Sequence, residues 1–473
     1  MKPVYLCEEK QYHINDLENI LHSVCITTDV SKLVKDMQEC HLVCKIESKS
    51  DVYKFTCVGI TIFNDFVFMV YPKYLKSFET YNKSKQQDEI KFILQAIRRY
   101  RKDYSIYKDS EEQITSGEAD GILGIILFII DDYYMNGVYT NYKDIVKVGD
   151  PERIDWDRTI NDGTPYMIDG FPIYTEYIVH EMKEDNDSLI SLIHQIAVSR
   201  CMYYLSEWGL DYIFSAEDDL YIEKTFQDCG SFESIIAEIS LEQNIQFDSR
   251  KMEVLKALQS FIEYEKRHAQ KIVSKLNNEY SIFGTNNFDM LWQRACEVAF
   301  SDVYKTPIIE LYDKGLLDNK PINDSDSISS TVEHPIWTIE RKKQRADESL
   351  ELDCVSIERT HKVDYLAIID AKYYMIDVDK PSIGAPGVGD IIKQYAYQMA
   401  VDKFIKDQAS QCFRINNYFV MPSESNKVIK GNASLKFFEK IANVNTIEVR
   451  LVPAKDILQC YILNSHLELS YLR

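Results

Sequence analysis

The sequence lacks the features that would mark a secreted, disulfide-stapled or membrane-spanning protein. Its eleven cysteines are odd in number, and no two form a Cys-x-x-Cys pair, so we expect reduced thiols and a cytoplasmic location. The N-terminal segment has too short an apolar stretch for a signal peptide. The longest apolar block, residues 121–130, has about half the length needed to cross a bilayer. The sequence therefore predicts a soluble protein without a membrane segment.

The chain also lacks the excess of basic residues that is typical of a simple nucleic-acid binder. Residues 111–250 hold 29 Asp and Glu against 8 Lys and Arg, which accounts for the whole net charge of −21. The remainder is neutral overall and contains short basic clusters, among them residues 98–102 and 341–345. A single cluster of this kind is more often a solvated face than a phosphate-binding surface. The acidic middle of the chain is better suited to a protein partner than to DNA.

With 473 residues and 45% apolar content, the chain is long enough for several domains. Two β-branched and aromatic runs, 53–63 and 66–71, are separated by Asn64-Asp65 and predict a hairpin near the N-terminus. Apolar helical patterns cover residues 122–134 and 188–204, and a long charged helix begins at Arg250. His194, on the second of these helices, fits a packing or a surface position better than a catalytic role. We thus expect an α+β multi-domain protein: a β-containing N-terminal domain (1–110), an acidic, mainly helical middle region with a long connector helix (111–285), and a C-terminal α/β domain (286–473).

The C-terminal region contains an apolar run, Asp364–Tyr374, that places Asp370 and Lys372 two residues apart. Side chains at i and i+2 share one face of a strand. Alone, such a pair is more typical of a surface ion pair at the end of a core strand. A second predicted strand, residues 350–358, precedes it and carries Asp353, which a hairpin would bring close to Asp370. Two carboxylates and one ammonium are the groups that a metal-dependent phosphodiesterase requires.

A helix predicted over residues 390–404 follows a loop rich in Gly and Pro. Asp390, Gln394 and Tyr397 fall on one face of this helix, at i, i+4 and i+7. In a nuclease centre, Asp353 and Asp370 would bind Mg²⁺, with Mn²⁺ as an alternative ion, and Lys372 would stabilise the transition state. We expect Gln394 or Tyr397 to orient the DNA phosphate.

These residues resemble the motif of the PD-(D/E)xK nuclease superfamily, with Leu352 where the superfamily usually has proline. The whole chain is similar to the LlaJI-type, McrC-like restriction endonucleases. The segments that carry this similarity span roughly residues 50–460 in the family's order. They are Cys57-Val-Gly59, Val70-Tyr-Pro-Lys-Tyr74, Asn136-Gly137-Val-Tyr139, Ile154-Asp-Trp156, Thr159-Ile160, Pro172-Ile-Tyr174, Leu291-Trp292 and Ile369-Asp-Ala-Lys-Tyr-Tyr374.

The resemblance implies a C-terminal α/β domain of the PD-(D/E)xK restriction-endonuclease-like type and a role in a two-component antiviral restriction system. In such a system the nuclease subunit forms a hetero-oligomer with an AAA+ GTPase of the McrB type and cleaves double-stranded DNA. The N-terminal and middle regions are the expected contacts to the motor. A helix over residues 287–300 has Gln293 where related sequences usually have Glu, and Glu297, one turn later, is a candidate third metal ligand.

Two other functions remain open from the sequence. The second hypothesis is that the chain is a regulatory adaptor that stimulates its GTPase with weak or no nuclease activity, and Gln293 in place of Glu keeps this hypothesis open. The third reading is a nuclease that acts without any motor. DNA cleavage and GTP hydrolysis, assayed side by side, separate the first two hypotheses.

Overall fold

The computed structural model describes residues 2–23, 29–63, 66–106, 121–149, 154–185, 188–214, 222–269, 280–321, 323–361, 363–405, 413–442 and 444–473. The chain divides into two compact units. Unit 1 comprises residues 1–3, 62–67 and 114–283, and unit 2 comprises residues 4–61, 68–113 and 284–473. The predicted N-terminal and C-terminal regions thus share unit 2. The turn predicted at Asn64-Asp65 and the end of the long connector helix lie outside the described residues.

Unit 1 is built on four helices that pack against one another: α4 (Gly121–Asn136), α6 (Leu189–Glu207), α7 (Phe232–Ile245) and α8 (Ser249–Ala269). Serine side chains cap two of them, because Ser188 accepts the Ser191 N–H and Ser231 accepts the Ser234 N–H. His194 is wholly buried on α6, and its Nδ1 accepts the Tyr139 N–H at 2.8 Å. This confirms the packing position, one of the two expected for His194.

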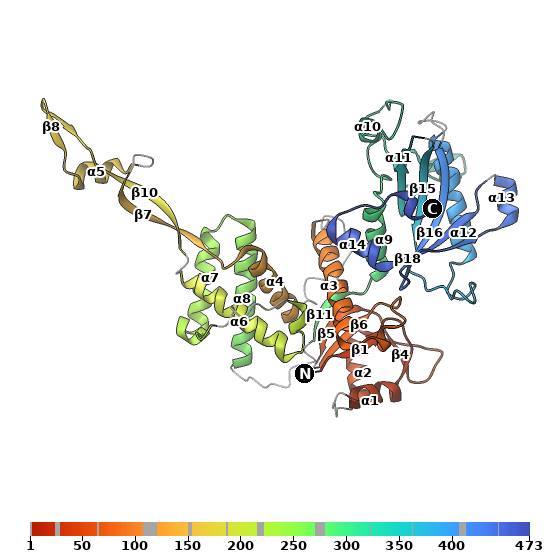
Figure 1. Ribbon diagram of the computed structural model, residues 1–473, viewed down its shortest axis with the longest axis horizontal. Helices are drawn as coiled ribbons and strands as arrows, with labels where there is room; N and C mark the ends of the chain where they lie inside the picture. Colours follow the sequence, from red (N-terminus) through yellow and green to blue (C-terminus); the bar gives the residue numbers. More distant parts are fainter. Residues whose placement is uncertain are drawn as a thin grey trace. The chain divides into compact units, whose positions relative to one another are not determined.

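A long strand pair interrupts the helices of unit 1. Strands β7 (Asn141–Gly149) and β10 (Tyr177–Asp185) pair antiparallel over nine residues, and α5 (Trp156–Asp162) and the short hairpin β8 (Tyr166–Ile168) to β9 (Phe171–Ile173) lie between them in sequence. Figure 1 shows this arm extending from the helices. The sequence predicts this region only as mainly helical, and it does not predict the arm. The tip of the arm is exposed and apolar, with Met167 at 64% and Phe171 at 73% exposure.

The strands of the N-terminal region form two small sheets. The first has the strand order β1-β6-β5-β11 and the second the order β2-β4-β3. The expected run 53–63 is two strands, β4 and β5, rather than one. The strands of the two sheets and the helices that accompany them are β1 (Val4–Cys7), β2 (Tyr12–His13), α1 (Ile14–Ser23), α2 (Val30–Glu39), β3 (Val43–Lys45), β4 (Val52–Phe55), β5 (Val58–Phe63), β6 (Phe66–Tyr71), α3 (Lys83–Ile106) and β11 (Tyr280–Thr285).

The C-terminal part of unit 2 is organised around a five-stranded mixed sheet with the order β14-β15-β16-β18-β17. The central pairs, β15 with β16 and β16 with β18, are parallel, whereas both edge strands run antiparallel to their neighbours. The strands are β14 (Cys354–Glu358), β15 (Asp364–Ala371), β16 (Phe413–Ser423), β17 (Ile429–Ala433) and β18 (Ile447–Pro453).

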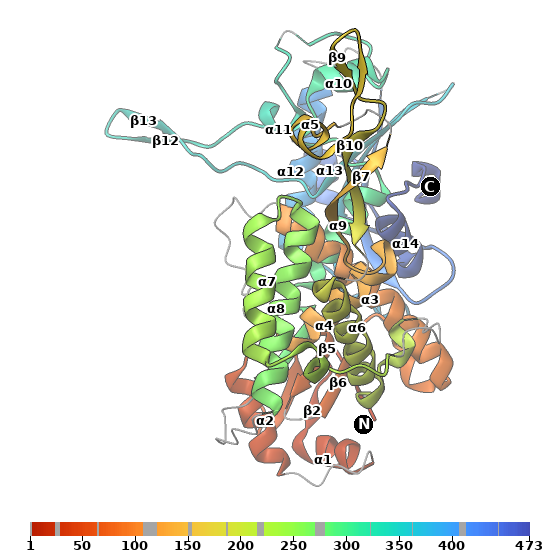
Figure 2. The same ribbon diagram turned by 90° about the vertical axis from the view of Figure 1, so that its left-hand side faces the viewer.

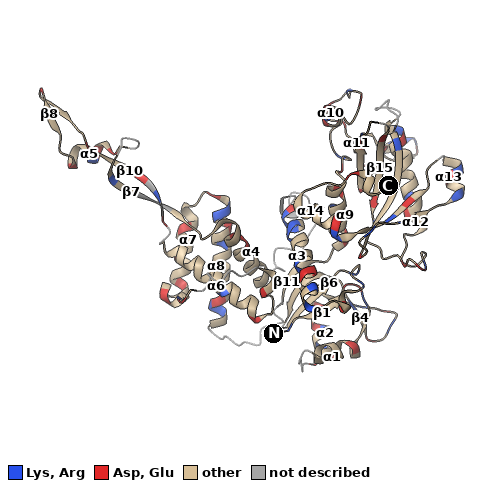
Figure 3. Cartoon of the chain, in the orientation of Figure 1, with Lys and Arg blue, Asp and Glu red and all other residues tan. Residues whose placement is uncertain are grey.

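Helices supply the hydrophobic cover that this sheet needs. Helix α12 (Val388–Phe404) joins β15 to the parallel strand β16, and its Tyr397 and Val401 pack in one core with Val355 and Ile368 of β14 and β15. Helices α9 (Phe288–Ala299) and α14 (Ala454–Leu463) also contact the sheet. A short helix, α13 (Lys436–Ala442), carries two exposed lysines, Lys436 and Lys440 (Figure 3).

Strands β14 and β15 are shorter than the sequence predicts. The strand predicted over residues 350–358 begins only at Cys354, and the strand predicted over 364–374 ends at Ala371. The sequence also predicts a single strand over residues 337–342, and this prediction is wrong, because the chain turns back at Glu340 and Arg341 to form a hairpin of β12 (Ile336–Ile339) and β13 (Lys342–Arg345). Figure 2 shows this hairpin projecting from α11 (Ile328–Thr331) and α12. No helix among the described residues is long and apolar enough to cross a membrane.

Candidate active site

The register of β14 and β15 brings Asp353 and Asp370 together. Cys354 pairs with Ile369, so the next position outward places Asp353 opposite Asp370 in the antiparallel arrangement. Asp353 Oδ2 accepts the Ala371 N–H at 3.1 Å, which fixes the carboxylate at the end of β15. The hairpin that the sequence predicted therefore forms, although Asp353 lies just before β14 rather than within it.

Asp370 is buried, with 2% of its surface exposed. Its Oδ1 lies 3.2 Å from Lys372 Nζ, whereas Oδ2 is buried without a hydrogen-bond partner in the described part of the chain. Burial, together with the nearby Asp353 carboxyl, raises the pKa of Asp370 above its ordinary value, and Lys372 opposes this rise. A second positive charge beside these two carboxyls would therefore be stabilising.

Lys372 lies between two carboxylates from different elements. Its Nζ is 3.2 Å from Asp370 Oδ1 on β15 and 3.2 Å from Asp390 Oδ1 on α12. Burial disfavours the charged ammonium, but the two carboxylates outweigh this effect and raise the pKa of Lys372. Lys372 is therefore charged at neutral pH. Asp390 also accepts the Gly387 N–H at 2.9 Å, which fixes it in the first turn of α12.

Asp390 is a residue of the site that the sequence did not assign a role. The sequence placed it on one helical face with Gln394 and Tyr397, and this face was the available signal. What the sequence could not show is that α12 begins beside the end of β15, because that contact depends on the path of the Gly-rich and Pro-rich loop.

Gln394 and Tyr397 are not at the surface of the site. Both are buried, with at most 1% exposure. Gln394 Nε2 donates to the Tyr418 carbonyl at 3.3 Å, and the Tyr397 hydroxyl donates to the Glu351 carbonyl. Gln394 Oε1 is buried without a hydrogen-bond partner in the described part of the chain. These contacts hold β16 and the segment that leads into Asp353, and a role of either residue in orienting a phosphate stays a prediction.

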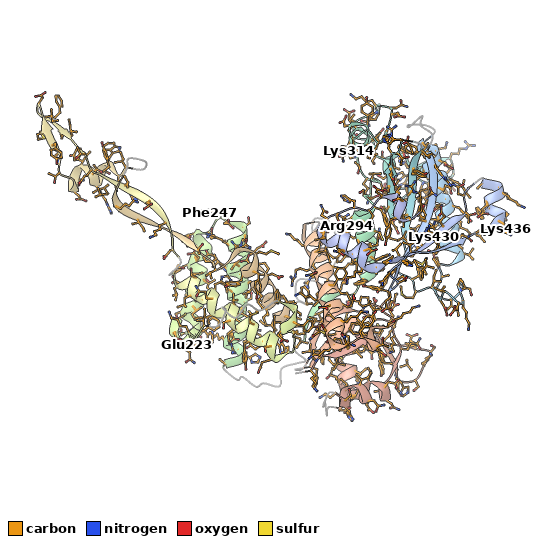
Figure 4. All side chains as sticks on the ribbon, in the orientation of Figure 1. Glu223, Phe247, Arg294, Lys314, Lys430 and Lys436 are labelled. Atoms are coloured by element: carbon orange, nitrogen blue, oxygen red, sulfur yellow. The ribbon has the colours of Figure 1, made fainter. Side chains whose placement is uncertain are left out.

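Glu297 is engaged by its own helix. Its Oε2 accepts from Arg294 Nη1 at 2.7 Å, and its Oε1 accepts from Gln293 Nε2 at 3.3 Å; Arg294 is labelled on α9 in Figure 4. The described residues contain no group of three or more His, Cys, Asp or Glu side chains that could hold a metal ion. The structure therefore presents Asp353 and Asp370 as the acidic pair and does not bring Glu297 into a three-carboxylate cluster with them.

The pair fits a Mg²⁺ ion on chemical grounds. Mg²⁺ prefers carboxylate oxygens, keeps several waters, and is commonly held by one or two protein carboxylates together with substrate phosphates. Asp370 offers a buried oxygen without a donor, and Asp353 lies beside it. A divalent cation would supply the positive charge that these carboxyls lack.

A contact with the N-terminal part of unit 2 holds the residue that follows Lys372. The Tyr373 hydroxyl donates to Glu8 Oε2 at 2.5 Å, and the Lys73 backbone N–H donates to the same oxygen at 3.2 Å. Lys73 Nζ also lies 4.4 Å from the centre of the Tyr373 ring. Glu8 and Tyr373 are 365 residues apart, so no local pattern could have revealed this contact.

Comparisons with known proteins show which family this chain resembles. The model of the LlaJI restriction endonuclease family matches residues 57–452. The BsuMI component YdjA, a type II restriction enzyme component of Bacillus subtilis (strain 168), is 28% identical over 317 residues. That alignment covers 66% of this chain and 60% of the relative's length.

Two solved structures also show similarity. The half-complex of Thermococcus gammatolerans McrB AAA+ hexamers with bound McrC contains a chain with 11% identity and a TM-score of 0.34, and the match covers 98% of this chain and 100% of that one. The cryo-EM structure of the Thermococcus gammatolerans McrBC complex gives 12% identity and a TM-score of 0.22, over 62% of this chain and 85% of that one.

Proposed function

Because the chain belongs to the LlaJI restriction endonuclease family, we propose that it is the DNA-cleaving subunit of a two-component restriction system and that its centre is formed by Asp353, Asp370 and Lys372. The observation that carries this proposal is the convergence of one buried carboxylate, a second carboxylate opposite it and a lysine 3.2 Å away. The contacts within the site and the family membership support it independently.

The proposed chemistry is metal-dependent hydrolysis of DNA phosphodiester bonds. Asp353 and Asp370 would hold Mg²⁺, or Mn²⁺ in its place, which when bound lowers the pKa of a coordinated water and neutralises charge on the phosphate. Lys372 stays charged between Asp370 and Asp390 and is placed to stabilise negative charge that develops on the phosphate. Asp390 and the backbone bond from Asp353 to Ala371 hold these groups in position before the substrate binds.

We also propose that an AAA+ GTPase of the McrB type is the partner and that it activates cleavage in a hetero-oligomer. The resemblance to the McrC-like restriction endonucleases over roughly residues 50–460 supports this partner. The acidic middle region and the exposed apolar tip of the β8–β9 hairpin are compatible with a protein contact. DNA recognition by the motor subunit would explain how a nuclease functions with a net charge of −21.

The test is to measure DNA cleavage and GTP hydrolysis together, with the full chain, its GTPase, DNA and Mg²⁺. We expect Asp370→Asn and Lys372→Ala to abolish cleavage while stimulation of GTP hydrolysis stays at the wild-type level. Asp379→Asn and Lys380→Ala, in the exposed loop that follows the site, are matched controls and should cleave normally. Full cleavage by either site variant would overturn the assignment of the centre.

A regulatory adaptor is the second candidate function. One observation favours it: both carboxylate oxygens of Glu297, the candidate third metal ligand, accept hydrogen bonds from Gln293 and Arg294. The adaptor would stimulate GTP hydrolysis but show no metal-dependent cleavage in the wild type. The same pair of assays therefore distinguishes the two functions.

A further inference from the structure

The β12–β13 hairpin is exposed on both faces. All eight residues of its two strands are exposed, and the two turn residues, Glu340 and Arg341, have φ angles of 48° and 67°. Positive φ at both central positions is the requirement of a tight two-residue hairpin turn. The pair of strands therefore forms a narrow ribbon, which projects from the rest of the domain in Figure 2.

The side chains of this ribbon combine two kinds of residue that a merely solvated hairpin does not need. Ile336, Trp337 and Ile339 are exposed at 67%, 65% and 68%. Four cations lie within five residues, Arg341–Arg345, against a single acid at Glu340, so residues 336–345 carry a net charge of +3 in a chain whose net charge is −21. Exposed apolar residues among clustered cations are typical of a surface that contacts nucleic acid.

The register distributes both kinds of side chain over both faces. Ile336 lies opposite Arg345 and Thr338 opposite Lys343 on one face, because directly paired residues of an antiparallel ribbon share a face. The other face carries Trp337 opposite Gln344 and Ile339 opposite Lys342. A ribbon that enters a groove of duplex DNA meets a row of phosphates on each side. Cations on both faces match that arrangement.

The base of the hairpin is tied to the segment that leads to the catalytic centre. The Ala346 N–H donates to the Pro335 carbonyl at 2.8 Å, and Ser349 Oγ donates to the Glu333 carbonyl at 2.7 Å. The Tyr304 hydroxyl then binds the Leu350 carbonyl at 2.8 Å. Asp353 follows Arg345 by eight positions, which limits the distance between their Cα atoms to about 29 Å, shorter than one turn of duplex DNA.

We propose that the β12–β13 hairpin is a DNA-binding ribbon that enters a groove of the duplex, with its cations on the phosphates and Trp337 against the sugars and bases. The inference rests on the proposed nuclease function for its substrate, and it adds to this chain a DNA contact of its own, independent of the motor. A protein partner is disfavoured by composition. The apolar tip formed by β8 and β9, residues 166–173, contains no lysine or arginine, whereas this ribbon is dominated by them.

The test uses the full chain and a fluorescein-labelled DNA duplex, with binding measured by fluorescence anisotropy over a range of salt concentrations. The variant is Trp337→Ala combined with Lys342→Ala and Lys343→Ala. The matched control removes the same kinds of residue from α13: Phe437→Ala, which loses a ring that is 65% exposed, with Lys436→Ala and Lys440→Ala. Lys436 is labelled at the end of this helix in Figure 4.

We expect the ribbon variant to lose at least about tenfold in affinity and to reduce the slope of log Kd against log salt by about two, one for each lysine removed. The α13 control should bind as the wild type does. Equal affinity in the ribbon variant and the wild type, an equal loss in the control, or no DNA binding by the wild-type chain would each overturn the proposal.

The failure of this proposal and that of the nuclease function are distinguishable. Asp370→Asn is expected to bind DNA as tightly as the wild type while it fails to cleave. A wild-type chain that binds through the ribbon but never cleaves would support the ribbon and refute the nuclease. A ribbon variant that binds and cleaves normally, with partner, DNA and Mg²⁺ present, would refute the ribbon and leave the nuclease intact.

Discussion

Removing the Tyr373 hydroxyl should loosen the contact between the N-terminal part of unit 2 and the segment that directly follows β15. In Tyr373→Phe, Glu8 keeps only the Lys73 N–H as a donor to Oε2. Glu8 is 6% exposed, and burial raises its pKa, so the lost hydrogen bond is one to a poorly solvated carboxyl. Such a bond contributes about 1.5–3 kcal/mol. The ring itself is retained, and with it the packing on Phe288 at 5.2 Å.

The assay is urea unfolding of the full chain together with hydrogen exchange of peptides that cover β1 and residues 370–376. We expect Tyr373→Phe to lower the local opening free energy by about 2 kcal/mol. Tyr374→Phe is the matched control, because Tyr374 is 39% exposed. Since Tyr373 directly follows Lys372, we also expect slower DNA cleavage with unchanged DNA affinity.

A double-mutant cycle isolates the bond. In a Glu8→Ala background the hydroxyl has lost its acceptor, so Tyr373→Phe should then have almost no effect on stability. Two results would refute the reasoning: an effect of Tyr373→Phe no larger than that of the Tyr374→Phe control, or an undiminished effect when Glu8 is already alanine.

Three further predictions follow from contacts in the two units. Burial lowers the pKa of His194 from 6.5 to about 4, so the stability that the neutral imidazole contributes is complete above pH 6.5 and is lost as the pH falls toward 4. At pH 5 the loss is about 2 kcal/mol. His194→Gln should therefore reduce, by that amount, the difference between the free energies of unfolding measured in urea at pH 7 and at pH 5. Arg250 Nε and Nη2 each lie 2.8 Å from the buried Asp132 carboxylate, so Arg250→Ala should destabilise unit 1 by about 2 kcal/mol, measured by hydrogen exchange of α4 and α8, and an unchanged exchange rate would contradict this. Asp390→Asn removes one of the two carboxylates that hold Lys372, so cleavage should slow by about 10- to 100-fold with DNA binding retained, and a wild-type rate would show that Asp390 does not position Lys372.

The proximity of Asp353, Asp370 and Lys372 was predictable because its signals are local. Asp370 lies on β15, Lys372 is the first residue after the end of that strand, and Asp353 directly precedes β14. The hairpin and the period-two alternation were therefore sufficient to predict that the three residues converge. The side chains of Gln394 and Tyr397 were correctly assigned to one helix but not to its buried face. Helix α12 has apolar residues on more than one side. Its packing against β14 and β15 decides which of its polar side chains become buried.

The contacts that the sequence did not reveal join residues far apart in the chain. Asp390 reaches Lys372 because of a loop conformation, and Glu8 reaches Tyr373 across most of the chain. The β12–β13 turn escaped prediction because Glu340 and Arg341 are not the Asn or Gly residues that normally mark positive φ. The β7–β10 arm was missed because its strands are separated by 27 residues that contain a helix and a second hairpin.

The most direct test of the catalytic centre is a crystal structure of the full chain after exposure to Mn²⁺, with the ion located by its anomalous scattering. The account predicts one ion bound by carboxylate oxygens of both Asp353 and Asp370, at about 2 Å from each, next to Lys372. The Asp370→Asn variant should lose this ion. A saturating Mn²⁺ soak that leaves the pair without an ion, or that places the ion on other residues, would contradict the central claim.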